Sequence, residues 1–122
     1  ENLSAEERRL MESCGGQLML FRLRGPLSFG AAKGISARMG LVSNYQVLIL
    51  DITEVPRIGV TAALAIERMV QEAQMLGRVA FVAGANQRLK ERLERFGVNA
   101  VITDRLDALR RASDHLSLKR IT

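Results

Sequence analysis

The feature that most constrains this chain is a run of four apolar residues at positions 47–50, Val-Leu-Ile-Leu. Such a run is typical of a β-strand that is covered on both faces, as in a parallel sheet between layers of helices. Asp51 ends the run, Pro56 restricts the loop that follows, and Gly59 opens the next element. Over residues 62–73 the apolar side chains recur at helical spacing along one face. The segment therefore predicts a buried strand, a polar loop and a helix.

The same alternation continues along the rest of the chain. Further strands are predicted over residues 17–24, 78–83 and 100–103, and further helices after Ser4, over residues 28–39, after Asn86 and after Asp104. Strands that alternate with helices indicate the α/β class, and 122 residues are enough for one domain with a core. We therefore predict a single α/β domain around one mostly parallel or mixed sheet of about four strands, with four to five helices.

In the strand over residues 17–24, alternate side chains form two faces. One face is expected to carry Met19, Phe21 and Leu23, and the other Leu18, Leu20, Arg22 and Arg24. Because the second face ends in two arginines, we expect it to reach water there.

A capping box marks the N-terminal helix. Ser4 is its predicted N-cap, with Glu7 three residues later, and the helix should stop before the glycine pair that follows. Because few apolar residues follow the box, we interpret residues 1–16 as a weakly anchored connector. Residues 17–117 are predicted to form the domain itself, and residues 118–122 a frayed tail.

The helix that follows Asn86 has a sequence signal at each end. Asn86 is its predicted N-cap. Gly97 suits the left-handed residue that ends a helix in the Schellman motif, with Val98 positioned to contact Leu93. The buried side chains of this helix are expected to be Leu89, Leu93 and Phe96.

The formal charge is +5, from 18 Lys and Arg against 13 Asp and Glu. A nucleic-acid-binding surface needs clustered cations with exposed aromatic side chains. Over residues 88–95 the cations instead alternate with Glu91 and Glu94, and in the C-terminal helix they lie beside Asp104 and Asp107. We interpret both as solvated helix faces and expect no nucleic-acid partner. A basic surface that faces an anionic membrane leaflet is the alternative.

Residue types that carry catalysis or bind metals are isolated in this sequence. Cys14 is the only cysteine, so no internal disulfide can form and no second thiol is available for a metal or redox pair. His115 has no nucleophile or carboxylate at a suitable spacing. The segment around Asp51 resembles the phospho-acceptor of receiver domains, but Leu-Arg-Gly at residues 23–25 replaces the acidic pair that would hold magnesium. We therefore expect no catalytic residue, no cofactor and no metal site.

The connection between the central strand and helix is where we expect the functional surface. Ligand sites of open α/β sheets gather beyond the carboxyl ends of the strands, where a helix N-terminus offers free amides. The candidate regulatory residues in this connection are Asp51, Thr53, Pro56, Gly59, Val60 and Thr61.

Three ordered blocks of this sequence resemble the STAS domain, which anti-sigma factor antagonists share with the tails of SulP-type anion transporters. The family pattern D-x-S/T-x-V-P-x-I-D-x-T-A is filled by Asp51, Thr53, Val55, Pro56, Ile58, Thr61 and Ala62. The segments R-G-P-L-S-F-G-A-A at 24–32 and G-A-N-Q-R-L-K-E-R-L-E-R-F-G-V at 84–98 resemble blocks of the transporter tails. The chain looks most like the SulP-type bicarbonate transporters of cyanobacteria.

One departure separates the two branches of the family. Gly59 replaces the second Asp of the pattern, and Val60 stands where antagonists carry the serine that a kinase phosphorylates. Valine has no hydroxyl, so the serine-kinase switch is expected to be absent, and Thr61 is expected to be an ordinary first-turn helix residue. The alternative function is a stand-alone, antagonist-like signalling module that binds a partner kinase.

The resemblance implies a non-enzymatic regulatory and assembly domain of a transporter, with sodium-coupled bicarbonate uptake as the expected transport. Its partners would be its own transmembrane domain, a second copy in a homodimer, and a regulatory protein or a nucleotide. It would lie at the cytoplasmic face of the inner or plasma membrane, and the start at Glu1 suggests a piece of a larger chain. The candidate dimer contacts, predicted to lie off the core, are Leu10, Met11, Leu64, Arg68, Gln71 and Met75.

Overall fold

The structure is a computed structural model, and it describes residues 3–25, 27, 30, 33–34, 37–38, 44–95, 97–98 and 100–121. Its helices are α1 (Ala5–Cys14), the short 3₁₀ helix η1 (Gly15–Gln17), α3 (Val60–Met75), α4 (Gln87–Arg95) and α5 (Arg105–Ile121). Its strands are β1 (Leu18–Arg24), β2 (Val47–Glu54), β3 (Val79–Ala83) and β4 (Val101–Ile102). The predicted α/β class and four-stranded sheet are confirmed.

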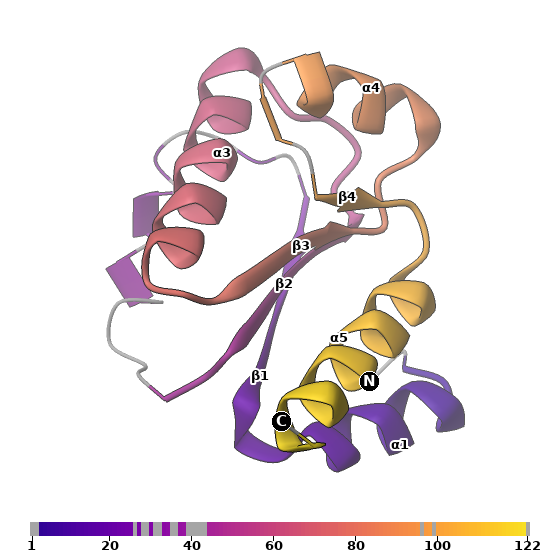
Figure 1. Cartoon of the computed structure of the whole chain (residues 1–122). Coiled ribbons are helices and arrows are strands. Elements are labelled where there is room, and N and C mark those ends of the chain that lie inside the picture. The colour runs from indigo at the N-terminus through magenta and orange to yellow at the C-terminus, as the bar shows by residue number, and fades with distance from the viewer. Residues whose placement is uncertain are drawn as a thin grey trace.

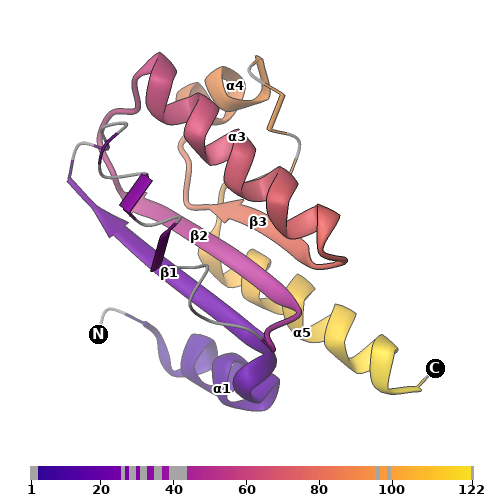
Figure 2. The same cartoon turned by 90° about the vertical axis from the view of Figure 1, so that its left-hand side faces the viewer.

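The four strands form one parallel sheet in the order β1-β2-β3-β4. The sheet therefore grows in one direction, with each new strand placed next to the previous one. When the crossover connections all have the same handedness, their helices lie on the same face of the sheet. Figures 1 and 2 show α3 and α4 on one face, and the two terminal helices, α1 and α5, side by side on the other.

Two hydrophobic clusters follow from this arrangement, one on each face of the sheet. The cluster under α3 and α4 includes Leu48, Leu50 and Ile52 of β2. The cluster under α1 and α5 includes Val47 and Ile49. Alternate side chains of one strand thus enter opposite cores, which is the arrangement that a continuous apolar run predicts. The predicted faces of β1 are confirmed as well, since Met19, Phe21 and Leu23 belong to the first cluster and Leu18 and Leu20 to the second.

Several predicted helix ends are confirmed in atomic detail. The capping box of α1 is present, with Ser4 Oγ accepting from the Glu7 amide and the Glu7 carboxylate accepting from the Ser4 amide. At the start of α4, Asn86 Oδ1 accepts from the Leu89 amide at 2.8 Å. At its end, the Val98 amide donates to the Leu93 carbonyl at 3.0 Å, as the Schellman motif requires.

Three expectations about boundaries are corrected. β2 continues to Glu54, so Asp51 lies inside the strand and not at its end. α1 is firmly packed against α5, because Leu10, Met11 and the buried Cys14 join the second hydrophobic cluster. α5 continues to Ile121, so the predicted tail beyond Ser117 is helical that far.

Two predictions cannot be followed in the structure. Residues 30, 33–34 and 37–38 are helical, but most of the helix predicted over residues 28–39 lies outside the described residues, and so does Phe96. Among the described residues, no helix is both long enough and apolar enough to cross a bilayer.

Candidate functional site

The connection between β2 and α3 is held in place by backbone contacts and by the core. The Gly25 amide donates to the Glu54 carbonyl at 3.0 Å, and Leu27 forms a parallel bridge with Ile58. The side chains of Val55 and Ile58 are buried in the cluster under α3. Much of the family pattern therefore serves to fasten this loop to the sheet.

The remaining residues of the loop face solvent. Pro56, Gly59, Val60 and Thr61 are exposed. Gly59 is the N-cap of α3 and provides no side-chain hydrogen bond to the helix. No described side chain caps the first amides of α3, which leaves them suited to an outside acceptor, and the helix dipole makes this end positive. Of the candidate regulatory residues, these four are accessible in the loop and at the start of α3.

Asp51 and Thr53 belong to β2, and they differ in exposure, because Asp51 is only 2% exposed whereas Thr53 is exposed. Its Oδ1 accepts hydrogen bonds from both the amide and the hydroxyl of Thr53. Gly84, at the end of β3, lies against the same threonine with a φ of 87°. A Cβ at position 84 would come within 2.8 Å of the Thr53 amide nitrogen, so the backbones of the two segments require glycine here.

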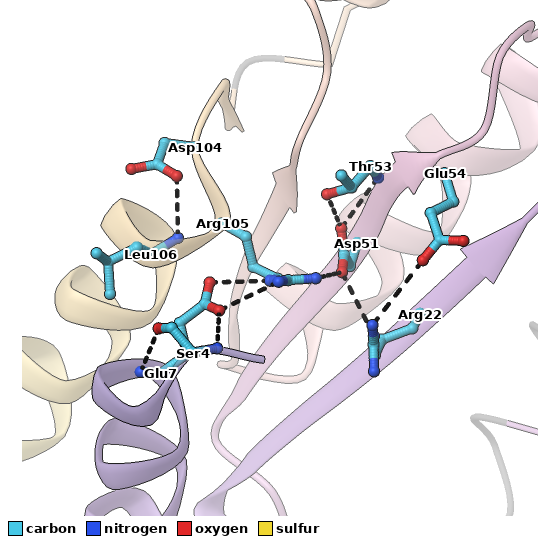
Figure 3. A network of polar contacts seen from close by, with 9 residues as sticks. All are labelled: Ser4, Glu7, Arg22, Asp51, Thr53, Glu54, Asp104, Arg105 and Leu106. Atoms are coloured by element: carbon cyan, nitrogen blue, oxygen red, sulfur yellow. Dashed lines mark hydrogen bonds and ion pairs between the residues drawn. The ribbon is translucent and has the colours of Figure 1, made fainter. Parts of the chain in front are cut away.

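Arg105, the first residue of α5, joins Asp51 to the N-terminal helix (Figure 3). Its Nη1 donates to Asp51 Oδ2 at 3.0 Å. Its Nε and Nη2 donate to the two carboxylate oxygens of Glu7 at 2.9 and 3.1 Å. This bidentate pair is the strong geometry for arginine and carboxylate. One partly buried guanidinium therefore connects α1, α5 and β2.

Arg22 extends the network toward the edge of the sheet. Its Nε lies 3.8 Å from Asp51 Oδ2, and its Nη2 lies 4.0 Å from Glu54 Oε2. Arg24 lies 3.9 Å from the same carboxylate of Glu54. These distances are those of electrostatic contacts rather than hydrogen bonds. The expectation that Arg22 simply reaches water is wrong, because its side chain is only 20% exposed.

The contacts shift the pKa values of the groups in the network. Hydrogen bonds from Arg105 hold the pKa of Glu7 below its usual value, against the opposing effect of burial. Hydrogen bonds to Glu7 raise the pKa of Arg105 further above its already high value. Both groups are therefore charged at neutral pH, and the pair stabilises the fold as an ion pair.

This network is structural in character and offers little to a phosphoryl-transfer mechanism. Both carboxylate oxygens of Asp51 already accept hydrogen bonds from this chain. Among the described residues, no three His, Cys, Asp or Glu side chains are grouped as a metal ion would need. Asp51 therefore acts here as an internal partner for Arg105.

Sequence reasoning singled out Asp51 and Thr53 but missed Arg105, Glu7 and Arg22 as their neighbours. Glu7 was recognised only as a capping residue. The sequence predicts that Arg105 lies on a solvated helix face, yet its side chain is only 14% exposed. No local pattern could have paired it with residues 54 and 98 positions away in the chain.

The candidate dimer contacts fall into two groups. Leu64, Arg68, Gln71 and Met75 lie on the exposed side of α3, and Met75 is 85% exposed. Leu10 and Met11 are partly buried against the core, so the prediction that they lie off it is wrong.

Comparison with known proteins agrees with this architecture. The family model described as the STAS domain matches residues 9–113. The bicarbonate transporter BicA of Synechocystis sp. is 38% identical to the chain over 96 residues, and BicA of Picosynechococcus sp. is 38% identical over 93 residues. These matches cover 79% and 76% of the chain but only 17% and 16% of the relatives. The chain therefore spans about a sixth of the length of these transporters.

A solved structure shares the fold over the whole chain. The STAS domain of a SulP transporter from Vibrio cholerae superposes with a TM-score of 0.76 at 27% identity. The match covers 98% of this chain and 100% of that domain. On the strength of the family match, the two homologous transporters and the shared fold, the chain belongs to the STAS domain family.

Proposed function

We propose that the chain is the regulatory and assembly domain of a SulP-type anion transporter and performs no catalysis of its own. The observation that carries this proposal is the 38% identity to bicarbonate transporters over 79% of the chain. The fold of a SulP transporter STAS domain supports it. In this proposal the ion path lies in a transmembrane domain, which is the first partner of the chain.

The transported ion that we propose is bicarbonate, taken up together with sodium. Bicarbonate is proposed because both relatives are bicarbonate transporters. The coupling to sodium is what the family resemblance implies. The domain would influence how fast the transporter works or how it assembles, but not which ion it selects.

The packing of α1 supports a role in communication with the membrane part. In the proposed transporter, α1 connects the last transmembrane span to the domain at the cytoplasmic face. Glu7 of this helix is hydrogen-bonded to Arg105, which holds Asp51 next to the β2–α3 connection. A connector that is fastened in this way moves with the domain as one body. Displacement of the domain would therefore be transmitted to the span above it.

Assembly would use the exposed side of α3. Leu64 is 46% exposed and Met75 is 85% exposed, with Arg68 and Gln71 between them. A two-fold dimer uses one patch twice, so a modest patch is sufficient for weak pairing. We expect the 122-residue chain to self-associate at roughly tens of micromolar, which sedimentation over a concentration series measures. Leu64→Glu combined with Met75→Glu should abolish it, whereas Arg111→Glu on α5 should not.

The decisive experiment is made with the full-length transporter in cells that lack their own bicarbonate uptake. Uptake of labelled bicarbonate is compared, with and without sodium, between the intact protein and a form lacking residues 17–122. We expect lower uptake or poorer assembly with the same preference for bicarbonate over sulfate. A change of preference would place the domain in the ion path and contradict the proposal. Unchanged uptake and assembly would contradict a regulatory role.

A further inference from the structure

A basic groove lies between the β2–α3 loop and α4. Its described lining residues are Pro56, Arg57, Ile58, Gly59, Asn86, Arg88, Leu89, Arg92 and Arg95, and its volume is about 1060 Å³. Ile58 and Leu89 are buried and form its apolar floor, whereas the four arginines are exposed. The sequence suggested that the cations of α4 are dispersed among glutamates, and the groove corrects that interpretation.

The geometry of α4 explains why these cations converge. Arg88, Arg92 and Arg95 are four and three residues apart, so they lie on one side of the helix. The three positions span about 10 Å along the helix axis. Arg57 approaches from the β2–α3 loop, on the other wall of the groove. Residues from two separate segments thus direct four positive charges to one place.

The four guanidinium groups have no counter-charge among the described residues. Within the described part of the chain, none of them forms an ion pair or a side-chain hydrogen bond. Glu91 and Glu94 are on the same helix, but neither lines the groove, and Glu91 accepts from Gln87 at 3.2 Å. Like charges at a spacing of four residues destabilise a helix. A bound anion would offset that repulsion.

The N-terminus of α3 adds to the positive potential. Gly59 lines the groove and leaves the first amides of α3 without a side-chain cap. Backbone amides at a helix N-terminus and arginine side chains both favour phosphate oxygens. The helix end and the arginine cluster are independent features, and they meet on the same groove.

We propose that this groove binds a compact anion with several adjacent negative charges, of the polyphosphate type. A monovalent ion such as bicarbonate could contact one or two of the arginines and would leave the others unneutralised. A chain of phosphates can contact Arg88, Arg92 and Arg57 at the same time. None of the described lining residues is aromatic, so the recognition depends on phosphate and not on the stacking of a base. The inference does not depend on which ion is transported.

Phosphates of this kind have two sources, a soluble polyphosphate and the headgroups of an anionic membrane. The test measures binding of the 122-residue chain to tripolyphosphate by calorimetry, and to phosphatidylglycerol vesicles by co-sedimentation, with phosphatidylcholine vesicles as the blank. Binding should weaken as ionic strength rises, because the contacts are charged. ATP and tripolyphosphate should bind with similar affinity if the base is not recognised.

Two variants with the same change of charge distinguish a site from a general attraction. Arg88→Gln combined with Arg92→Gln removes half of the cluster, and we expect binding to fall at least about tenfold. Arg110→Gln combined with Arg111→Gln removes two exposed arginines from α5, on the other face of the sheet, and should change binding less than about twofold. Circular dichroism checks that both variants remain folded.

The possible outcomes assign the source or overturn the proposal. Tripolyphosphate binding that only the groove variant loses supports a soluble ligand. Vesicle binding alone, with the same selective loss, supports a lipid headgroup. Equal loss in the two variants means that net charge attracts the anion, and it overturns the site. Absence of binding to both probes overturns it as well.

Discussion

Two charged regions flank the β2–α3 connection, and they differ in what neutralises their charges. On the α1/α5 side, the network around Asp51 contains three carboxylates and three guanidinium groups, of which Arg24 and Glu54 are exposed; its members are Glu7, Asp51, Glu54, Arg22, Arg24 and Arg105. On the α3/α4 side, the groove contains four exposed guanidinium groups and no carboxylate among its described lining residues. The first region is balanced within the chain, whereas no described lining residue balances the second.

The difference follows from the energetic cost of burial. A charge that is removed from water must find a partner inside the protein, and removing that partner is costly. An exposed charge keeps its hydration, so the fold can leave it without a partner at small cost. Internal pairing therefore indicates a role in holding elements together, and an unpaired exposed cluster indicates a surface available to an outside anion.

The largest effect is expected from Asp51→Ala. The substitution leaves the partly buried Arg105 without its partner on the sheet and removes the carboxylate nearest to Arg22. Breaking a buried pair in this way should lower the free energy of unfolding by about 3–5 kcal/mol, measured by urea denaturation. Asp107→Ala is the control, because its exposed pair with Arg111 should contribute at most about 0.5 kcal/mol. Similar losses in the two variants would break the distinction between buried and exposed pairs.

A core substitution on the groove side tests how firmly α3 is packed on the sheet. Ile66 of α3 is fully buried in the cluster on that face. Ile66→Ala should lower the free energy of unfolding by about 2–5 kcal/mol, since it removes apolar contacts and leaves a cavity. Thermal or chemical denaturation measures the loss. An unchanged midpoint would mean that α3 is loosely held on the sheet.

Acid should weaken the network through Glu7. Because Arg105 lowers the pKa of Glu7 in the folded state, the unfolded chain binds a proton to this residue more readily. The contribution to stability is fully present above the unfolded pKa of about 4.3, and it is lost as the pH falls through the lower folded value. The difference in unfolding free energy between the wild type and Glu7→Gln should therefore shrink with acidification. A difference that grows toward low pH would contradict the sign of the shift.

The smallest effect is expected in the groove. Arg88→Gln combined with Arg92→Gln removes two exposed charges that form no ion pair among the described residues. The free energy of unfolding should change by no more than about 0.5 kcal/mol. A small gain in stability is expected, because the repulsion between two arginines four residues apart is relieved. A loss above about 1 kcal/mol, well outside that range, would show that these arginines are structural. That result would remove the contrast with the network around Asp51.

Much of the fold could be predicted because its signals are local. The two faces of β1, the capping box at Ser4 and the Schellman end at Gly97 each depend on residues within a few positions of one another. The family pattern around Asp51 was equally visible. The length of β2 could not be predicted in this way. An acidic residue such as Asp51 ends an apolar run in the sequence, even when a distant arginine allows that residue to be buried in the fold.

By itself, the sequence determined the α/β class, the alternation of the elements, most helix ends and the absence of a hydroxyl at Val60. Only the tertiary structure decided which charges are paired. The contact between Glu7 and Arg105 spans 98 positions of the sequence. The groove brings Arg57 close to α4, although α3 and β3 lie between them in the sequence. Hydrophobic periodicity and capping are set by neighbours along the chain, whereas Coulomb interactions depend on distance through space. The packing of helices on the two faces of the sheet sets those distances.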